Sequence, residues 1–440
     1  MVPNGEKFIL PSVEVPRWQR AAEHVAAAFK TEWGTETVCL FEPPMESPEE
    51  PSIARYQAAE HLCPCGNPKI PTRCVPISAL SCDSFIDTRD YSAIKRVIAM
   101  CNGEIEKSSA GPFARLGWFG ELRDWIESVV EPMGFHLTRK FQQLNASASF
   151  SLIRFATDGP ALWFKAVGEP NLREFGITSV LAQLFPEYLP PMVATRGSWN
   201  GWLSKEVEGR LLSDIQEQAL WEHAAASLAR LQIKSIDRGP QILGSGAHDL
   251  GSAALSRRIE PVMSFMAQLM ERQKKVPPAV LGRGDLLALA EGLQSAVEAM
   301  EATGIPETIG HLDLNPGNII VPTNNCAFLD WAEAYVGNPL FSLDYLVQHA
   351  RRAFGEDSGV RAKVIAAYRT EWSDVVSEAA IADALAVAPL LAVFAYAAGN
   401  DIWRAPEGLE EPTAGYLRSL ARRMHRESRR LADRRTLCPQ

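Results

Sequence analysis

One segment in the second half of the chain interrupts an otherwise helical sequence pattern. Between residues 310 and 331, two short apolar runs surround a polar stretch, which predicts two strands joined to a loop. The loop contains His311, Asp313 and Asn318 with the spacing His-x-Asp-x-x-x-x-Asn, and the second apolar run ends at Asp330. The predicted hairpin therefore carries two carboxylates and an amide within about 20 residues of the chain.

The rest of the chain predicts a sheet-rich segment followed by a helical one. Short β-rich runs occur at 141–144, 150–155 and 161–167, a helix is predicted at 172–185, and a further strand lies around 201–207. Beyond residue 213, apolar side chains recur at three- and four-residue spacing and predict helices at 215–232, 253–274, 285–302, 360–372, 381–398 and 414–431.

The first 110 residues predict a small α/β unit, with a helix at 18–33 and a strand at 37–41. Two Pro-containing loops follow at 42–51 and 63–76, and a linker at 107–111 precedes an amphipathic helix. The predicted apolar face of that helix consists of Leu116, Phe119, Leu122, Ile126 and Val129. We therefore predict an accessory domain at 1–110, a linking helix at 111–134, a sheet-rich lobe at 135–208 and a helical lobe at 209–440.

The hairpin residues resemble those of the aminoglycoside phosphotransferase family, which is related to choline kinases and protein kinases. The resemblance implies that Asp313 is the catalytic base, that Asn318 and Asp330 bind Mg²⁺, and that His311 braces the loop. Asp344 resembles the later structural Asp of the family, which ties the loop to the helical lobe. Phosphoryl transfer needs few groups, because positioning and charge neutralisation provide most of the catalysis. The alternative is an ordinary exposed turn.

The same resemblance implies a lysine that contacts the phosphates of ATP. Lys165 is the single charged residue of its apolar run, and Glu174 lies early in the next predicted helix. A lysine in a dry cleft needs a counter-charge, which Glu174 would supply. Taken separately, the two residues would more often be an exposed strand-end lysine and a solvated helix glutamate.

Two further nucleotide contacts are predicted. The turn at 143–150 carries Ser147 and Ser149 without a glycine, which departs from the glycine-rich loop of protein kinases. Backbone amides and hydroxyls there can still face phosphate, and an ordinary Ser-rich turn is the alternative. The stretch at 202–209 resembles the hinge between lobes, where adenine would bind backbone groups near Glu206 and Val207. An ordinary edge strand is the alternative to that hinge.

Charge and composition limit the partners. A net charge of -9 argues against nucleic acid as a partner. The longest apolar run, at 384–398, is shorter than the roughly 20 residues that span a bilayer, so we expect a buried helix, no membrane contact and a cytoplasmic protein. The scattered cysteines argue against a disulfide framework. Cys63, Cys65, Cys74 and Cys82, with His61, lack the usual spacing of a zinc knuckle. Oligomeric state stays open.

We therefore predict an α+β protein with a two-lobed, protein kinase-like fold and an N-terminal α/β accessory domain. The accessory domain faintly resembles a Nudix layout, although Glu23 and Glu32 lie too far apart to form its carboxylate cluster. The predicted reaction is ATP- and Mg²⁺-dependent phosphoryl transfer, or transfer from GTP, to a hydroxyl of a small molecule such as an aminoglycoside or a metabolite alcohol. The alternatives are a pseudokinase without turnover and a nucleotide hydrolase in the N-terminal unit. The acceptor is undecided, because fold does not determine substrate.

Overall fold

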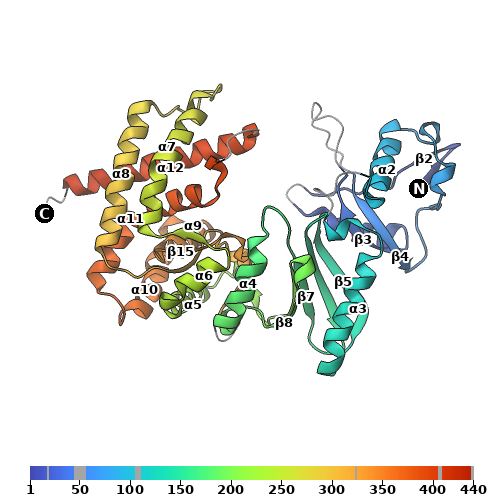
Figure 1. The fold of residues 1–440 in the computed structure, drawn as a ribbon, viewed down its shortest axis with the longest axis horizontal. Coiled ribbons are helices and arrows are strands. Elements are labelled where there is room, and N and C mark those ends of the chain that lie inside the picture. Colours follow the sequence, from blue (N-terminus) through green and yellow to red (C-terminus); the bar gives the residue numbers. More distant parts are fainter. Residues whose placement is uncertain (17–18, 44–55, 105–110, 323–324, 405–408, 438–440) are drawn as a thin grey trace. The chain divides into compact units, whose positions relative to one another are not determined.

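The structure is a computed structural model, and it describes residues 1–16, 19–43, 56–104, 111–322, 325–404 and 409–437 (Figure 1). It consists of two compact units. Unit 1 contains residues 1–175 and 191–206, and unit 2 contains residues 176–190 and 207–440. Most of the predicted loop at 42–51 and of the predicted linker at 107–111 lies outside the described residues. The predicted division into four segments remains a prediction.

An antiparallel sheet of five strands forms the centre of unit 1, in the order β5-β6-β7-β9-β8. Along β7, Leu162, Phe164 and Ala166 are buried, while Lys165 points to the other face, as the two-residue period of a strand requires. Lys165 is paired with Leu152 on β6 and with Trp202 on β9. The strands are β5 (Leu137–Ala146), β6 (Ser151–Thr157), β7 (Leu162–Ala166), β8 (Met192–Arg196) and β9 (Gly201–Lys205).

Helix α3 (Trp118–Val130) contributes the main apolar face packed into the core of this sheet. Its Leu122 and Ile126 have no exposed surface, and the Phe119 ring stacks on Phe155 of β6 with 6.0 Å between ring centroids. The predicted apolar face was wrong at one end. Leu116 is exposed because the helix begins only after Gly117, whose φ of 81° is a conformation that favours glycine.

The N-terminal elements of unit 1 are joined to β5 through a buried side chain. The Gln143 amide accepts a hydrogen bond from the Cys39 amide at 2.7 Å and donates one to the Cys39 carbonyl at 2.9 Å. The glutamine thus satisfies both backbone groups of Cys39, much as a neighbouring strand would. A Nudix-like layout stays a prediction. The elements are β1 (Val2–Asn4), β2 (Lys7–Ile9), α1 (Ala21–Glu32), β3 (Thr35–Phe41), β4 (Ala58–Pro64) and α2 (Thr88–Cys101).

Unit 2 is mainly helical and has its own hydrophobic core. Each helix predicted beyond residue 213 is present, and α10 has the predicted ends at both sides. The structure adds α9, which the sequence pattern did not reveal. The helices are α5 (Gln218–Lys234), α6 (Gly239–Gly244), α7 (Ser252–Glu271), α8 (Arg283–Ala302), α9 (Leu340–Phe354), α10 (Val360–Trp372), α11 (Glu378–Gly399) and α12 (Glu411–Leu437), preceded by most of α4 (Arg173–Leu184).

Helix α11 is the most apolar helix of the core of unit 2. Among the described residues, it is the one helix that is long and apolar enough to cross a membrane by length and composition. Half of its most apolar window is buried inside the protein, and it packs against α7, α8, α9 and α12. Leu391 and Phe394 have no exposed surface. The predicted buried helix at 381–398 is therefore confirmed.

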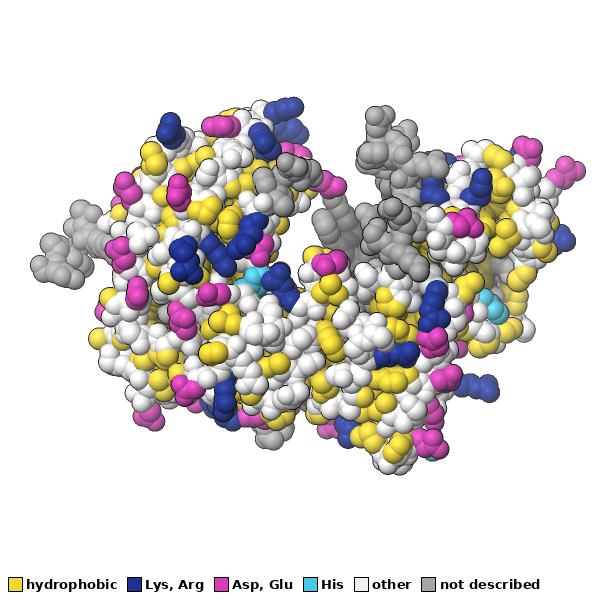
Figure 2. Space-filling model, in the orientation of Figure 1, with side chains coloured by type: hydrophobic (Ala, Val, Ile, Leu, Met, Phe, Trp, Pro, Cys, Tyr) yellow, Lys and Arg dark blue, Asp and Glu magenta, His cyan; other side chains and the backbone are white. Residues whose placement is uncertain are grey.

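Two small sheets of unit 2 carry the hairpin singled out in the sequence. One has the order β11-β15-β12 and the other β10-β13-β14. Figure 2 shows both acidic and basic side chains on the face of each unit that it displays. The strands are β10 (Arg210–Leu211), β11 (His248–Leu250), β12 (Thr308–His311), β13 (Ile319–Val321), β14 (Ala327–Phe328) and β15 (Ala334–Gly337).

Candidate active site

The predicted loop connects β12 to β13 and is stabilised by its own side chains. Asn315 precedes the short turn Pro316–Asn318, and its carboxamide oxygen accepts the Gly317 amide at 2.9 Å. An Asn at this position commonly caps such a turn, because its short side chain reaches the backbone two residues on. The Asn318 backbone carbonyl then accepts the Leu329 amide at 2.9 Å, which places the end of the loop beside the strand that leads to Asp330.

The His311 side chain holds this loop in place through hydrogen bonds to its backbone. Its side chain is fully buried, its Nδ1 accepts the Asp313 backbone amide at 3.1 Å, and its Nε2 contacts the Leu329 carbonyl at 3.0 Å. Because one ring nitrogen accepts and the other donates, these bonds require the neutral imidazole with its proton on Nε2. This arrangement agrees with the bracing role predicted for His311.

Asp313 lies at the centre of the loop and is partly exposed. Its Oδ1 accepts a hydrogen bond from the Tyr345 hydroxyl at 3.2 Å, and its Oδ2 accepts one from the Asn315 side-chain amide at 3.3 Å. Two donors fix the direction of the carboxylate, although both bonds are long. Burial, reinforced by the nearby Asp313 charge, raises the pKa of Tyr345 well above its ordinary value, so its hydroxyl stays a donor.

Asn318 and Asp330, the predicted magnesium ligands, offer hard oxygen donors near the same hairpin. The Asn318 amide nitrogen donates to the Asp313 carbonyl at 3.0 Å, and this bond directs the amide nitrogen inward and keeps the amide oxygen for another partner. Asp330 has a φ of 62°, a left-handed conformation that is uncommon for residues other than glycine. Such strain is often found where a side chain must be aimed at a ligand. These residues fit Mg²⁺, which takes one or two protein oxygens and completes its shell with phosphate and water.

Lys165 and Glu174 are brought together in unit 1. The Lys165 Nζ lies 2.5 Å from the Glu174 Oε1, with 15% and 1% of the two side chains exposed. The ammonium also lies 5.9 Å from the Phe150 ring centroid and 5.7 Å from that of Trp202. A buried ion pair is costly to desolvate, so one that holds a lysine among aromatic rings is a candidate for a functional role.

The serine turn, which we define as residues 147–149, connects β5 to β6 and is closed by local hydrogen bonds. The Ser147 amide donates to the Phe150 carbonyl at 2.9 Å, and the Ser149 amide donates to the Ser147 hydroxyl at 3.3 Å. The turn also lines a pocket of about 410 Å³, to which Phe41 and Glu42 contribute. Both predicted phosphate-contacting serines therefore border an open space in unit 1.

Glu206 has a structural partner of its own. Its carboxylate accepts two hydrogen bonds from the Arg154 guanidinium, at 2.6 and 2.7 Å, and one from the Trp163 indole at 3.1 Å. The hydrogen bonds from Arg154 are the main cause that lowers the pKa of Glu206. The Glu206 amide donates to the Ala161 carbonyl at 2.9 Å, so the predicted adenine contacts rest on the Glu206 carbonyl and on Val207.

The role predicted for Asp344 was wrong, and Ser342 performs it instead. The Ser342 hydroxyl accepts the His311 amide at 2.8 Å and also contacts the buried Tyr335 hydroxyl at 3.1 Å. The described contacts of the Asp344 carboxylate are with Gln348, at 3.5 Å, and Arg423, at 3.8 Å, and none is with the loop. Ser342 and Asp344 are two residues apart on α9, which is about 200° around the helix axis, so their side chains leave the helix in different directions.

The sequence analysis also missed Tyr345 and His349, which share one face of α9. Their ring centroids are 5.1 Å apart, and Tyr345 contacts the predicted catalytic base directly. Burial lowers the pKa of His349 and favours its neutral form. The four-residue spacing of the two rings was the available signal, but it needed α9 to be recognised as a helix.

Residues 196–375 match the model of the phosphotransferase enzyme family. This matched segment includes the hairpin that the sequence analysis singled out. The resemblance predicted from the hairpin is confirmed, and so is the prediction of a phosphotransferase. The predicted α+β class is also confirmed, since the structure combines helices with antiparallel and mixed sheets. The matched segment of this phosphotransferase contains Asp313, Asn318 and Asp330.

Several solved structures resemble the phosphotransferase at low identity. Macrolide 2'-phosphotransferase MphH from Brachybacterium faecium is 16% identical, with a TM-score of 0.41 over 68% of this chain and 96% of that one. Choline kinase LicA from Streptococcus pneumoniae is 14% identical, with a TM-score of 0.44 over 71% and 99%. Choline kinase from Cryptosporidium parvum Iowa II is 11% identical, with a TM-score of 0.49 over 71% and 96%. No curated protein matches the chain in sequence.

Proposed function

We propose that this phosphotransferase transfers the γ-phosphoryl group of ATP, with Mg²⁺, to a hydroxyl of a small molecule. The observation that carries the proposal is the geometry around Asp313. This carboxylate is oriented by Tyr345 and Asn315, rests on a loop braced by His311, and adjoins Asn318 through a hydrogen bond. A fixed, partly exposed carboxylate suits a group that accepts the proton of an attacking alcohol.

Asp313 would accept the proton of the acceptor hydroxyl as its oxygen attacks the terminal phosphorus. Asn318 and Asp330 would hold Mg²⁺, which neutralises charge on the phosphates of the bound nucleotide. Lys165, held by Glu174, would contact those phosphates, and the serine turn would cover them. Backbone groups at Glu206 and Val207 would bind adenine.

The acceptor is proposed at the level of a class, as an aminoglycoside-like compound or a metabolite alcohol. The family match supports an enzyme and does not favour a pseudokinase. We also propose a cytoplasmic location, which the free, exposed thiols of Cys63, Cys65, Cys74 and Cys82 support because they suit a reducing compartment.

The test is the Asp313→Asn variant of the full chain. ATP consumption would be measured with and without Mg²⁺ against pooled hydroxyl metabolites and aminoglycosides. Turnover by the parent should depend on Mg²⁺, and the variant should lose about 100- to 10,000-fold in kcat, the range typical of a missing general base. Calorimetry with a non-hydrolysable ATP analogue should show unchanged binding, because the substitution keeps the shape of the side chain.

Asp237→Asn is the matched control, because Asp237 is an exposed residue of the same unit. Normal turnover in Asp313→Asn would refute the assignment of the base. Nucleotide binding by the parent without turnover on any compound of the panel would instead favour the pseudokinase alternative.

A further inference from the structure

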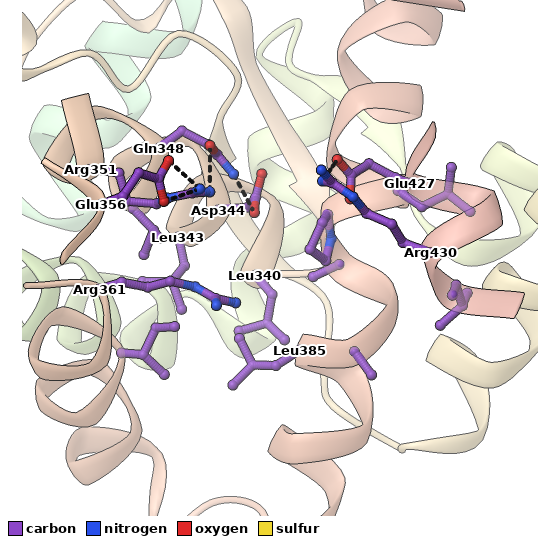
Figure 3. A pocket seen from close by; sticks show the side chains of 17 residues that line it. Leu340, Leu343, Asp344, Gln348, Arg351, Glu356, Arg361, Leu385, Glu427 and Arg430 are labelled. Carbon is purple, nitrogen blue, oxygen red and sulfur yellow. Dashed lines mark hydrogen bonds and ion pairs between the residues drawn. The ribbon is translucent and has the colours of Figure 1, made fainter. Parts of the chain in front are cut away.

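Unit 2 contains a pocket of about 380 Å³ that the proposed reaction does not use. It lies among α9, α10, α11 and α12, and Figure 3 shows side chains of these helices pointing into it. Its volume is within the range of sites that bind small molecules. The lining includes Leu340, Leu343 and Leu385, which provide an apolar wall.

The pocket is separate from the Asp313 site because α9 presents a different face to each. Leu340, Asp344, Val347 and Arg351 line the pocket with the three- and four-residue spacing of one helix face. Tyr345, which contacts Asp313, follows Asp344 directly and is therefore rotated by about 100° around the helix axis. A ligand of this pocket would thus occupy a site of its own.

Asp344 is the unusual group of the pocket. Its side chain is 10% exposed, yet its described partners are distant, with Gln348 Nε2 at 3.5 Å and Arg423 Nη2 at 3.8 Å. Burial raises the pKa of Asp344, with Glu427 adding to the effect and Arg423 and Arg361 opposing it. A buried carboxylate normally has close donors, because its desolvation is otherwise uncompensated.

Most other charges of the pocket are paired with each other. The Arg351 guanidinium binds the Glu356 carboxylate, with Nε at 2.9 Å from Oε2, and Arg430 binds Glu427 at 2.8 Å. Arg361 is the exception, since it has no ion-pair partner among the residues that the structure describes. Figure 3 shows its side chain extending into the pocket. After internal pairing, the pocket therefore offers one under-compensated carboxylate and one available guanidinium beside an apolar wall.

We propose that this pocket binds a small zwitterion with an apolar body, of the class of free amino acids. Its ammonium group would bind the Asp344 carboxylate, its carboxylate would bind the Arg361 guanidinium, and its side chain would lie on Leu340, Leu343 and Leu385. A ligand with a single charge would satisfy one group and leave the other without a partner. An arginine can hold a carboxylate with two parallel hydrogen bonds, which favours a carboxylate at that end.

Three compounds with the same aromatic body separate the two charges. Calorimetric titration of the full chain would compare L-phenylalanine with 2-phenylethylamine, which lacks the carboxylate, and 3-phenylpropionate, which lacks the ammonium. We expect L-phenylalanine to bind with a stoichiometry of one and the two analogues to bind about tenfold more weakly or worse, since each forfeits a bond to a charged group. Equal affinity for all three compounds would overturn the proposal, and so would the absence of binding by L-phenylalanine and every other neutral amino acid at saturation.

Two variants test which residue binds the ammonium group of the ligand and which binds its carboxylate. Asp344→Asn should weaken L-phenylalanine binding about tenfold or more and leave 3-phenylpropionate unaffected, while Arg361→Gln should weaken L-phenylalanine and leave 2-phenylethylamine unaffected. Lys363→Gln is the matched control, because Lys363 lies on α10 outside the pocket and should leave all three affinities unchanged. Circular dichroism would confirm that each variant is folded. Unchanged L-phenylalanine affinity in both pocket variants would place the ligand elsewhere and overturn the proposal.

Discussion

The carboxylate of Asp313 is oriented by neighbours that the hairpin motif does not contain. Tyr345 comes from α9, 32 residues further along the chain, and donates to Oδ1 at 3.2 Å. Ser342, on the same helix, receives the backbone amide of His311. Single residues of α9 therefore contribute both to the direction of the proposed base and to the position of the loop that carries it.

Replacing Tyr345 with phenylalanine tests this orientation. Tyr345→Phe removes one of two donors to Asp313 while keeping the ring against His349, so we expect kcat to fall about tenfold, the effect of one hydrogen bond to a charged group. Steady-state kinetics with a saturating acceptor would measure it. Tyr91→Phe, a change in unit 1 remote in the chain from the loop, should leave kcat unchanged. A kcat equal to that of the parent would contradict the orienting role.

The raised pKa of the Asp344 carboxyl group predicts that the stability of the protein depends on pH. Because burial raises its pKa in the folded chain, its ionised form destabilises the folded state. This penalty is fully present above the raised pKa and disappears as the pH falls through it to below the ordinary value of about 4. Asp344→Asn should therefore raise the midpoint of thermal unfolding at neutral pH, and the difference from the parent should vanish in acid.

Thermal unfolding by circular dichroism across this pH range would measure the effect of Asp344→Asn. Asp374→Asn, at an exposed position of the same unit, serves as the control. A variant less stable than the parent at neutral pH would show that the carboxylate is a net stabilising group.

At the scale of elements, the serine turn contains no glycine, but two glycines from neighbouring segments allow the backbone to pack closely against it. A Cβ added to Gly111 would lie 2.4 Å from the Ala148 carbonyl oxygen and 2.6 Å from the Ser149 Cα, and the Phe113 amide donates to the same carbonyl at 3.2 Å. Gly168 approaches the other side of the turn, where an added Cβ would lie 2.3 Å from the Ser149 Cβ. Glycines outside the turn thus permit its position.

Gly111→Ala should displace the serine turn, because its contacts are with backbone atoms that cannot move aside cheaply. We expect a loss of about 1–3 kcal/mol in the free energy of unfolding, as for other overpacked sites. Under the proposed function, KM for ATP should rise. Denaturant unfolding and steady-state kinetics would measure the two effects.

Gly120→Ala is the matched control for this prediction. Gly120 lies within α3 and an added Cβ there meets open space, so alanine should stabilise the helix by about 0.5–1 kcal/mol. An unchanged KM for ATP in Gly111→Ala, together with a measured loss of stability, would separate the turn from nucleotide binding.

At the scale of the whole molecule, the described residues form two main hydrophobic cores, one in each unit. The core of unit 1 joins α3 to the five-stranded sheet, and the core of unit 2 is built around α11. Separate cores allow the two units to lose stability independently, which a single unfolding free energy would not describe.

Leu391→Ala tests this independence. Leu391 has no exposed surface on α11, so its truncation should cost about 2–5 kcal/mol of stability. Hydrogen exchange followed by peptide should show lost protection in unit 2 and unchanged protection in α3. Leu287→Ala, at a leucine that is 58% exposed on α8, should have little effect. An equal loss of protection in both units would show that they unfold as one.

The sequence by itself determined the local features of this phosphotransferase. The hairpin motif, the pairing of Lys165 with Glu174 and most helices of unit 2 depend on residue spacing within short segments, where periodicity and turn chemistry act directly. It misassigned Asp344 and did not reveal α9, so Tyr345 and the pocket beside Asp344 stayed hidden. These features arise when helices distant in sequence pack together, because burial and orientation are set by neighbours from the whole unit. Only the tertiary structure could therefore decide that Ser342 holds the loop and that Asp344 faces a pocket of its own.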